Sequence, residues 1–358
     1  MTSFKEFLKR KNIVISAKRY GIDALGAMAH GLFCSLLIGT IFKTLGVQLG
    51  IPMFTEVGTF ASAMDGAAMA MAIGYALQAP PMVLYSLATV GWATDSLGGA
   101  GGPLAVLIIA IIAAECGKAV SKETKIDILV TPATTILVGV GLATVIAAPI
   151  GAAASAFGQL IKSATVLQPF LMGIAVSVLV GIALTLPISS AAICSVLGLT
   201  GLAGGAAVAG CCAQMVGFAV MSFRENRWGG LVSQGLGTSM LQMPNIVRNP
   251  RIWIPPTLTA AITGPIATCL FKLQMNDPAG GVNAGMGTCG MCGPIGVWTG
   301  WLAPTEDAIA KGAAAIVPGA MDWIGLVLIC IVLPAVLTWA FGLFFRKIGW
   351  IKEGDLKL

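Results

Sequence analysis

The feature that most constrains this chain is a series of apolar runs, many of them close to the ~20 residues that an α-helix needs to cross a bilayer. Only helices and closed barrels satisfy their backbone hydrogen bonds in lipid, and runs of this length indicate helices. The charged fraction is 10% and the hydrophobic fraction is 57%, whereas soluble domains carry about 25% charged residues. We therefore predict an all-α, polytopic membrane protein with about eight to ten transmembrane helices and re-entrant hairpins. The clearest runs cover residues 24–42, 104–114, 129–150, 169–186 and 323–345.

Positive charges predict how the chain is oriented. Lysine and arginine crowd residues 1–19, the loop at 118–125 and the tail at 346–358, and loops of this kind stay in the cytoplasm. Residues 1–19 also combine apolar residues at helical spacing with a basic face, which is typical of a helix lying on an anionic membrane surface. The acidic segment at 305–307 is an outer-loop candidate. We predict a multi-pass protein of the bacterial inner membrane with both termini in the cytoplasm, in contact with lipid and not with nucleic acid.

The same patterns suggest four parts. We expect a cytoplasmic amphipathic helix over residues 1–19, a membrane scaffold and dimerisation part over 20–165, a transport part with re-entrant hairpins over 166–345, and a cytoplasmic tail over 346–358.

The nine cysteines give little support for a metal or a cofactor. Most lie in apolar runs, where a reduced cysteine behaves as a small hydrophobic residue. Cys289 and Cys292 form a C-x-x-C pair, which is compatible with redox chemistry or half a zinc site, but no second pair stands at zinc-ribbon spacing. We favour packing for this pair, and predict no metal site, no cofactor and no catalytic residue.

Function is expected where the apolar helices are broken, because irregular backbone at membrane depth is tolerated only around a buried or wet cavity. Four such stretches cover residues 94–103, 186–190 with the glycine-rich run 198–210, 233–245 extending to 250, and 276–294. The first and fourth share the pattern Asp-x-x-Gly-Gly, at Asp95 and Asp277, which favours a repeated architecture with a binding site between the repeats. Chance similarity in a glycine-rich chain is the competing explanation.

The third broken stretch carries amides and hydroxyls that suit a polyhydroxyl solute. Such groups both donate and accept hydrogen bonds, as recognition of a sugar requires. The alternative is that they bond neighbouring helices as structural contacts. We predict contacts to a sugar-like substrate from residues of the third stretch and from the first and fourth, namely Gln234, Thr238, Ser239, Gln242, Asn245, Asn249, Asp95, Asp277, Asn283 and Thr288.

The segment 242–255 resembles a signature of the membrane-spanning enzyme IIC components of the sugar phosphotransferase system. Pro244, Asn249, Pro250, Ile254 and Pro255 match a Pro…Asn-Pro…Ile-Pro pattern in order. The resemblance is closest to the divergent branch of PfoR-like proteins. It implies an enzyme IIC-like fold, a homodimer, a C-terminal part with the sugar site, and a cytoplasmic partner, enzyme IIB, whose phosphocysteine phosphorylates the sugar during uptake. The basic residues at 118–125, Arg224 and Arg227 are compatible with docking of that partner.

The sequence departs from the enzyme IIC pattern where catalysis would be expected. Members carry a glutamate in an Asn-Glu-Pro triplet, and residues 236–238 stand there as Leu-Gly-Thr. Members also place a histidine in the substrate region, and residues 186–190 contain none. A carboxylate or an imidazole is the natural group to deprotonate a sugar hydroxyl for phosphoryl transfer. These departures weaken the prediction of coupled phosphorylation, whereas binding and translocation of a solute remain compatible with the sequence.

We therefore predict a transporter component that takes up a small polar solute, most simply a sugar or sugar derivative, by alternating access. The alternative is a membrane-embedded ligand sensor or regulator, as in PfoR-like proteins, which has lost the chemistry. A membrane-embedded enzyme has the least support, since the sequence holds no catalytic triad, P-loop or dinucleotide fingerprint.

Overall fold

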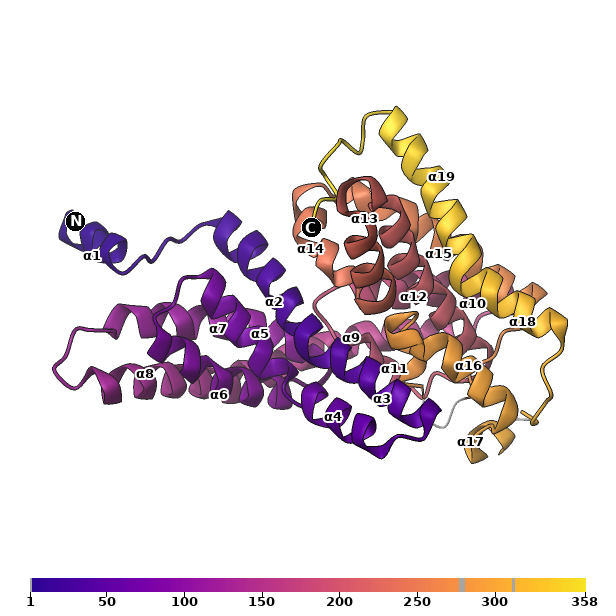
Figure 1. The fold of residues 1–358 in the computed structure, drawn as a ribbon, viewed down its shortest axis with the longest axis horizontal. Coiled ribbons are helices and arrows are strands. Elements are labelled where there is room, and N and C mark those ends of the chain that lie inside the picture. The colour runs from indigo at the N-terminus through magenta and orange to yellow at the C-terminus, as the bar shows by residue number, and fades with distance from the viewer. Residues whose placement is uncertain (1, 277–280, 311–312) are drawn as a thin grey trace. The chain divides into compact units, whose positions relative to one another are not determined.

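The computed structural model describes residues 2–276, 281–310 and 313–358, and within them the fold is helical apart from one isolated antiparallel bridge (Figure 1). The predicted all-α class is confirmed. The chain forms two compact units, Met1–Ala154 (unit 1) and Ser155–Leu358 (unit 2). The division falls inside the helix Ala148–Ala164, whereas the sequence led us to expect it after residue 165.

Several helical runs of the described residues are long and apolar enough to cross a membrane. Five runs meet this criterion. The helices Pro52–Ser62 and Asp65–Ala76, bent by 51° relative to each other, would form a sixth span if they cross the membrane together. The same bend also fits a re-entrant loop. The expected number of about eight to ten also counts shorter apolar helices, such as Pro169–Thr185. The five runs are Arg19–Leu49, Pro81–Val120, Asp127–Ala164, Gly201–Met221 and Ala320–Lys347.

Unit 1 is a helical bundle in which glycines permit close packing. Helix α5 packs against α2 and α6, and α6 packs against α7 and α8. A side chain at Gly91 of α6 would overlap the carbonyl oxygen of Gly66 in α5, so the two backbones touch directly. The main helices are α1 (Thr2–Arg10), α2 (Ala24–Leu32), α3 (Ile38–Leu49), α4 (Pro52–Ser62), α5 (Asp65–Ala76), α6 (Pro81–Gly98), α7 (Gly102–Val120), α8 (Asp127–Leu142) and α9 (Ala148–Ala164), with short π or 3-10 turns at Arg19–Asp23, Phe33–Leu37, Gly99–Gly101 and Ala143–Ala147.

A buried lysine ties the segment after α1 to the rest of unit 1. Lys118 Nζ lies 2.9 Å from the Glu115 carboxylate and donates to the carbonyl oxygens of Asn12 at 2.8 Å and Leu77 at 3.0 Å. A buried ammonium group is tolerated only with such partners. The basic loop and the N-terminal segment therefore lie at one end of this unit.

Unit 2 is built around α12 (Gly201–Met221), which is almost entirely buried. Helices α10, α15 and α19 pack along it. The remaining elements cover its two ends and include the broken stretches predicted from the sequence. The helices are α10 (Pro169–Thr185), α11 (Ser190–Val196), α12, α13 (Phe223–Val232), α14 (Met243–Arg248), α15 (Ile254–Pro265), α16 (Cys292–Leu302), α17 (Glu306–Ala310), α18 (Ala320–Val327) and α19 (Leu333–Lys347), with short turns at Ser233–Gly237, Ser239–Gln242, Pro250–Trp253, Ile266–Leu270, Asn283–Gly285, Cys289–Met291 and Leu328–Val332.

Small residues set the spacing of α10, α12 and α15. A side chain at Gly210 would overlap the carbonyl oxygen of Ser177 in α10, and one at Gly264 would overlap the carbonyl oxygen of Gly173. Ser177 Oγ donates to the carbonyl oxygen of Ala260 at 2.7 Å. Such contacts, together with hydroxyl hydrogen bonds, hold helices together in lipid, where burial of apolar surface gives no driving force between helices.

Candidate functional site

The third broken stretch has an irregular backbone, and most of its side chains are buried. A π-helical turn at Ser233–Gly237 is followed by Thr238 in extended conformation and a 3-10 turn at Ser239–Gln242. Thr238 Oγ1 accepts a hydrogen bond from the Met240 backbone N–H at 3.1 Å. Pro244 then stands in the first turn of α14, where its missing N–H leaves no donor unused.

Three amide side chains of this stretch form a hydrogen-bonded chain, which we name the amide cluster: Gln234, Gln242 and Asn245. Gln242 Nε2 donates to Gln234 Oε1 at 2.9 Å, and Asn245 Nδ2 donates to Gln242 Oε1 at 2.8 Å. Gln234 Nε2 in turn donates to Ser222 Oγ at 2.8 Å. All three side chains are buried, so each amide depends on its neighbours for hydrogen bonds.

The tail segment, residues 350–358, completes this cluster. The Leu356 carbonyl oxygen accepts from Gln242 Nε2 at 3.0 Å and from Asn226 Nδ2 at 2.7 Å. The Lys357 carbonyl oxygen accepts from Asn245 Nδ2 at 2.9 Å. The Leu356 side chain is fully buried. Predicted substrate contacts thus hold a segment of the chain itself through its main-chain carbonyls.

Asn249 extends the same contact. Its Nδ2 donates to the Trp350 carbonyl oxygen at 2.9 Å and to Asp355 Oδ2 at 2.8 Å. Asp355 Oδ2 also accepts from the Lys352 backbone N–H at 2.8 Å, and the Arg251 guanidinium stacks over the Trp350 ring at 5.4 Å. The Asn-Pro motif therefore fixes the tail segment against α14.

A second polar group lies deeper in unit 2, at the middle of α12. Ser239 Oγ and Thr185 Oγ1 are 2.8 Å apart. Gln214, fully buried in α12, accepts from Trp253 Nε1 at 3.0 Å and donates to Thr257 Oγ1 at 3.2 Å. The sequence did not lead us to Gln214 or Thr185. Their signal was a lone amide in the apolar run 201–221 and a hydroxyl at the end of the run 169–186.

A polar cavity of about 380 Å³ lies at the opposite end of α12. The backbones of Gly201 and Met275 pair as an antiparallel bridge there, which places Gln274 and Asn276 beside the start of α12. Asn276 Nδ2 donates to Gln274 Oε1 at 3.1 Å. Gly198 and Gly201 have φ values of +56° and +60°, which favour glycine in this turn. The lining residues are Thr165, Leu197, Gly198, Leu199, Thr200, Gly201, Ala203, Gln274, Asn276, Ala308 and Ala313.

The same two amides also line a neighbouring cavity of about 220 Å³, with Trp301, Lys272 and Asp322 in its wall. An indole face together with amides and a carboxylate is a suitable surface for a sugar ring. Helix α12 has 21 residues and is thus about 30 Å long, close to the hydrocarbon thickness of a bilayer. The polar cavities and the amide cluster therefore lie at opposite ends of a membrane-length helix.

The remaining predicted residues belong to other parts of the chain. Thr288 is buried and its Oγ1 lies 3.7 Å from Met215 Sδ. Asn283 begins a 3-10 turn and is half-buried, and Asp277 lies outside the described residues. Asp95 belongs to α6 of unit 1, where its carboxyl lies beside that of Asp65. Within unit 2, the structure gathers the predicted residues of the third stretch.

The C-x-x-C pair is buried in unit 2. Cys289 stands in the 3-10 turn Cys289–Met291 and Cys292 begins α16. Over residues 2–276, 281–310 and 313–358, no group of three or more histidine, cysteine or acidic side chains is placed to hold a metal ion.

Comparison with known proteins identifies a family. A family model described as "Phosphotransferase system, EIIC" matches residues 22–358, which includes nearly all of both units. No curated protein and no solved structure matches the chain.

Proposed function

Because this chain belongs to the phosphotransferase system EIIC family, and is thus the membrane permease component of such a system, we propose that it takes up a sugar or sugar derivative through unit 2. The observation that carries the proposal is the polar cavity beside Gln274 and Asn276. Its volume of about 380 Å³ falls in the range of small-molecule sites. Two amide side chains and glycine-rich backbone supply donors and acceptors for hydroxyl groups.

The solute would move along α12. Polar groups occur at three levels of this helix: the cavity at its first turn, Gln214 at its middle, and the amide cluster beyond Met221. The tail segment covers the amide cluster, whereas the polar cavity at the other end of α12 provides open space. This arrangement suits alternating access. After the tail segment undocks, the solute would contact the amide cluster, Thr238, Ser239 and Asn249.

Charge indicates which end faces the cytoplasm. The amide end carries Arg224, Arg227, Arg248, Arg251 and Arg346, in addition to the basic residues of the tail. By the positive-inside rule this end is cytoplasmic. Uptake then runs from the cavity to the amide cluster, and an enzyme IIB partner would dock on the basic face. We also expect a homodimer, with unit 1 as its scaffold.

A separate question is whether the solute is phosphorylated during transport. Deprotonation of a sugar hydroxyl needs a positioned base, and Leu236, Gly237 and Thr238 stand where the family has its glutamate. Asp355 of the tail segment is a carboxylate beside the third stretch, and it accepts a hydrogen bond from Asn249. We therefore propose transport as the primary activity, and product analysis decides whether phosphorylation accompanies it.

A PfoR-like sensor is the second candidate, and the docked tail segment favours it. A solute that competes for Gln242 and Asn245 would release residues 350–358, and this release would be a cytoplasmic signal without any transport. Vesicle experiments distinguish the two candidates, because a sensor binds the solute but does not accumulate it.

The test begins with thermal shifts of the purified protein against sugars, polyols and sugar acids, since a bound ligand raises apparent stability. A hit is then radiolabelled and offered to right-side-out vesicles, with and without enzyme IIB. We expect Asn276→Ala to abolish most of the uptake and Gln242→Ala to slow it. The matched control is Gln159→Ala, at an exposed position of α9. Binding without accumulation would favour the sensor, and no hit in the panel would contradict a sugar substrate.

A further inference from the structure

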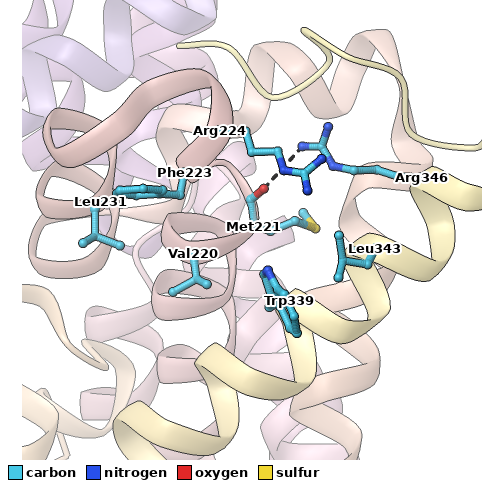
Figure 2. A pocket seen from close by; sticks show the side chains of 9 residues that line it. Val220, Met221, Phe223, Arg224, Leu231, Trp339, Leu343 and Arg346 are labelled. Carbon is cyan, nitrogen blue, oxygen red and sulfur yellow. Dashed lines mark hydrogen bonds between the residues drawn. The ribbon is translucent and has the colours of Figure 1, made fainter.

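Unit 2 has a third cavity, of about 250 Å³, at the end of α12 that carries the basic residues (Figure 2). It lies where the last turn of α12 meets α13 and the second half of α19. Its walls are the side chains of Val220, Met221, Phe223, Arg224, Leu231, Trp339, Leu343 and Arg346, with Gly342. This cavity shares no residue with the polar cavity or the amide cluster.

The cavity is amphipathic. Most of its wall is aliphatic or aromatic, while Arg224 and Arg346 lie together at one end of it, above Met221, in Figure 2. Arg346 is already paired: its guanidinium lies 2.7 Å from Glu225 Oε1 and donates to the Met221 carbonyl oxygen at 3.3 Å. In the described part of the chain, Arg224 forms no ion pair. Two guanidinium groups and one carboxylate leave a local charge of +1 at the cavity end.

The position of the cavity places it at the surface of the bilayer. Arg346 stands in the last turn of α19, at the end of the candidate span Ala320–Lys347. Trp339 and Phe344 on the same helix are about half exposed, at 52% and 57%. An aromatic belt with arginines at a helix end is the usual pattern at the boundary between hydrocarbon and headgroups.

We propose that this cavity binds an anionic phospholipid. One acyl chain lies along Leu231, Trp339 and Leu343, and the phosphodiester lies between Arg224 and Arg346. A phosphodiester carries one negative charge, which matches the local +1, and guanidinium groups bind phosphate oxygens in a bidentate manner. A headgroup that adds an ammonium ion cancels this match, so a lipid such as phosphatidylglycerol is preferred over phosphatidylcholine.

Native mass spectrometry and lipid titration of the purified full chain test this site. The probes are long-chain phosphatidylglycerol, the same lipid with six-carbon chains, phosphatidylcholine, and inorganic phosphate alone. We expect one tightly retained long-chain phosphatidylglycerol per chain. Arg224→Gln should weaken it roughly five- to tenfold, as expected for the loss of one basic contact to an anionic headgroup, and Arg224→Lys should weaken it less.

The matched control is Arg227→Gln, at an exposed arginine of the same helix that does not line the cavity. Equal losses in Arg224→Gln and Arg227→Gln would overturn the proposal in favour of general surface attraction. Equal retention of phosphatidylcholine would exclude recognition of the headgroup charge. Competition by inorganic phosphate or by the six-carbon lipid at the same concentration would show that the apolar wall takes no part, and would also overturn it. The melting temperature of each variant in phosphatidylcholine confirms that it is folded.

Discussion

Single glycines decide how closely the helices of unit 2 pack. A methyl group on Gly210 would overlap the Ser177 carbonyl oxygen, and backbone cannot move aside as a flexible side chain does. We predict that Gly210→Ala lowers the free energy of unfolding by about 1–3 kcal/mol, the usual cost of overpacking, measured as a lower melting temperature in detergent. At Gly141 of α8 nothing lies within 4 Å of an added methyl group, so Gly141→Ala should be neutral or slightly stabilising. Equal effects of the two changes would contradict direct contact of α10 with α12.

The docking of the tail segment can be tested with a single substitution. Leu356 is fully buried and its carbonyl oxygen accepts from two amides. An aspartate at this position would have to be buried without a partner, which costs several kcal/mol, so undocking of residues 350–358 is the easier response. We predict that Leu356→Asp makes this segment sensitive to protease, while the melting temperature of the helical bundle changes little. The exposed change Glu353→Ala should have no effect, and a tail that stays protected in Leu356→Asp would contradict the docking.

The contact of Arg10 in α1, and of Lys11 directly after it, with Glu123 depends on pH. The hydrogen bond from Lys11, together with the positive charges of Arg10 and Lys11, lowers the pKa of Glu123 below its ordinary value. A lowered pKa means that the contact contributes fully above the ordinary glutamate pKa and is lost as pH falls through the lowered one. We predict that a spin label at Lys5→Cys becomes more mobile below about pH 4. Glu123→Gln should show the mobile spectrum already at pH 7, whereas Glu6→Gln should not.

The sequence predicted features that depend on neighbouring residues along the chain. It did not predict contacts between segments that lie far apart in the sequence. Apolar runs and broken stretches are local patterns, so the helical membrane class and the burial of Gln234, Gln242 and Asn245 follow from them. The docking of residues 350–358 uses main-chain carbonyls at Leu356 and Lys357, which every residue possesses, and thus leaves no mark in the sequence. The division between the units falls inside α9, where no loop marks it in the sequence.

The orientation of unit 2 is the prediction on which the direction of transport depends. The amide end carries most of the positive charge, and α12 separates it from the end where Glu306 lies exposed in α17. We therefore expect Glu353→Cys to react with a membrane-impermeant thiol reagent in inverted vesicles only, and Glu306→Cys to react in intact cells only. Cys34 and Cys269, the exposed native cysteines of the described chain, are first replaced by alanine so that background labelling is low. Reaction of both positions from one side would mean that α12 does not connect the two membrane faces. The reverse pattern would place the amide cluster outside, so that uptake would begin at the tail segment and not end there.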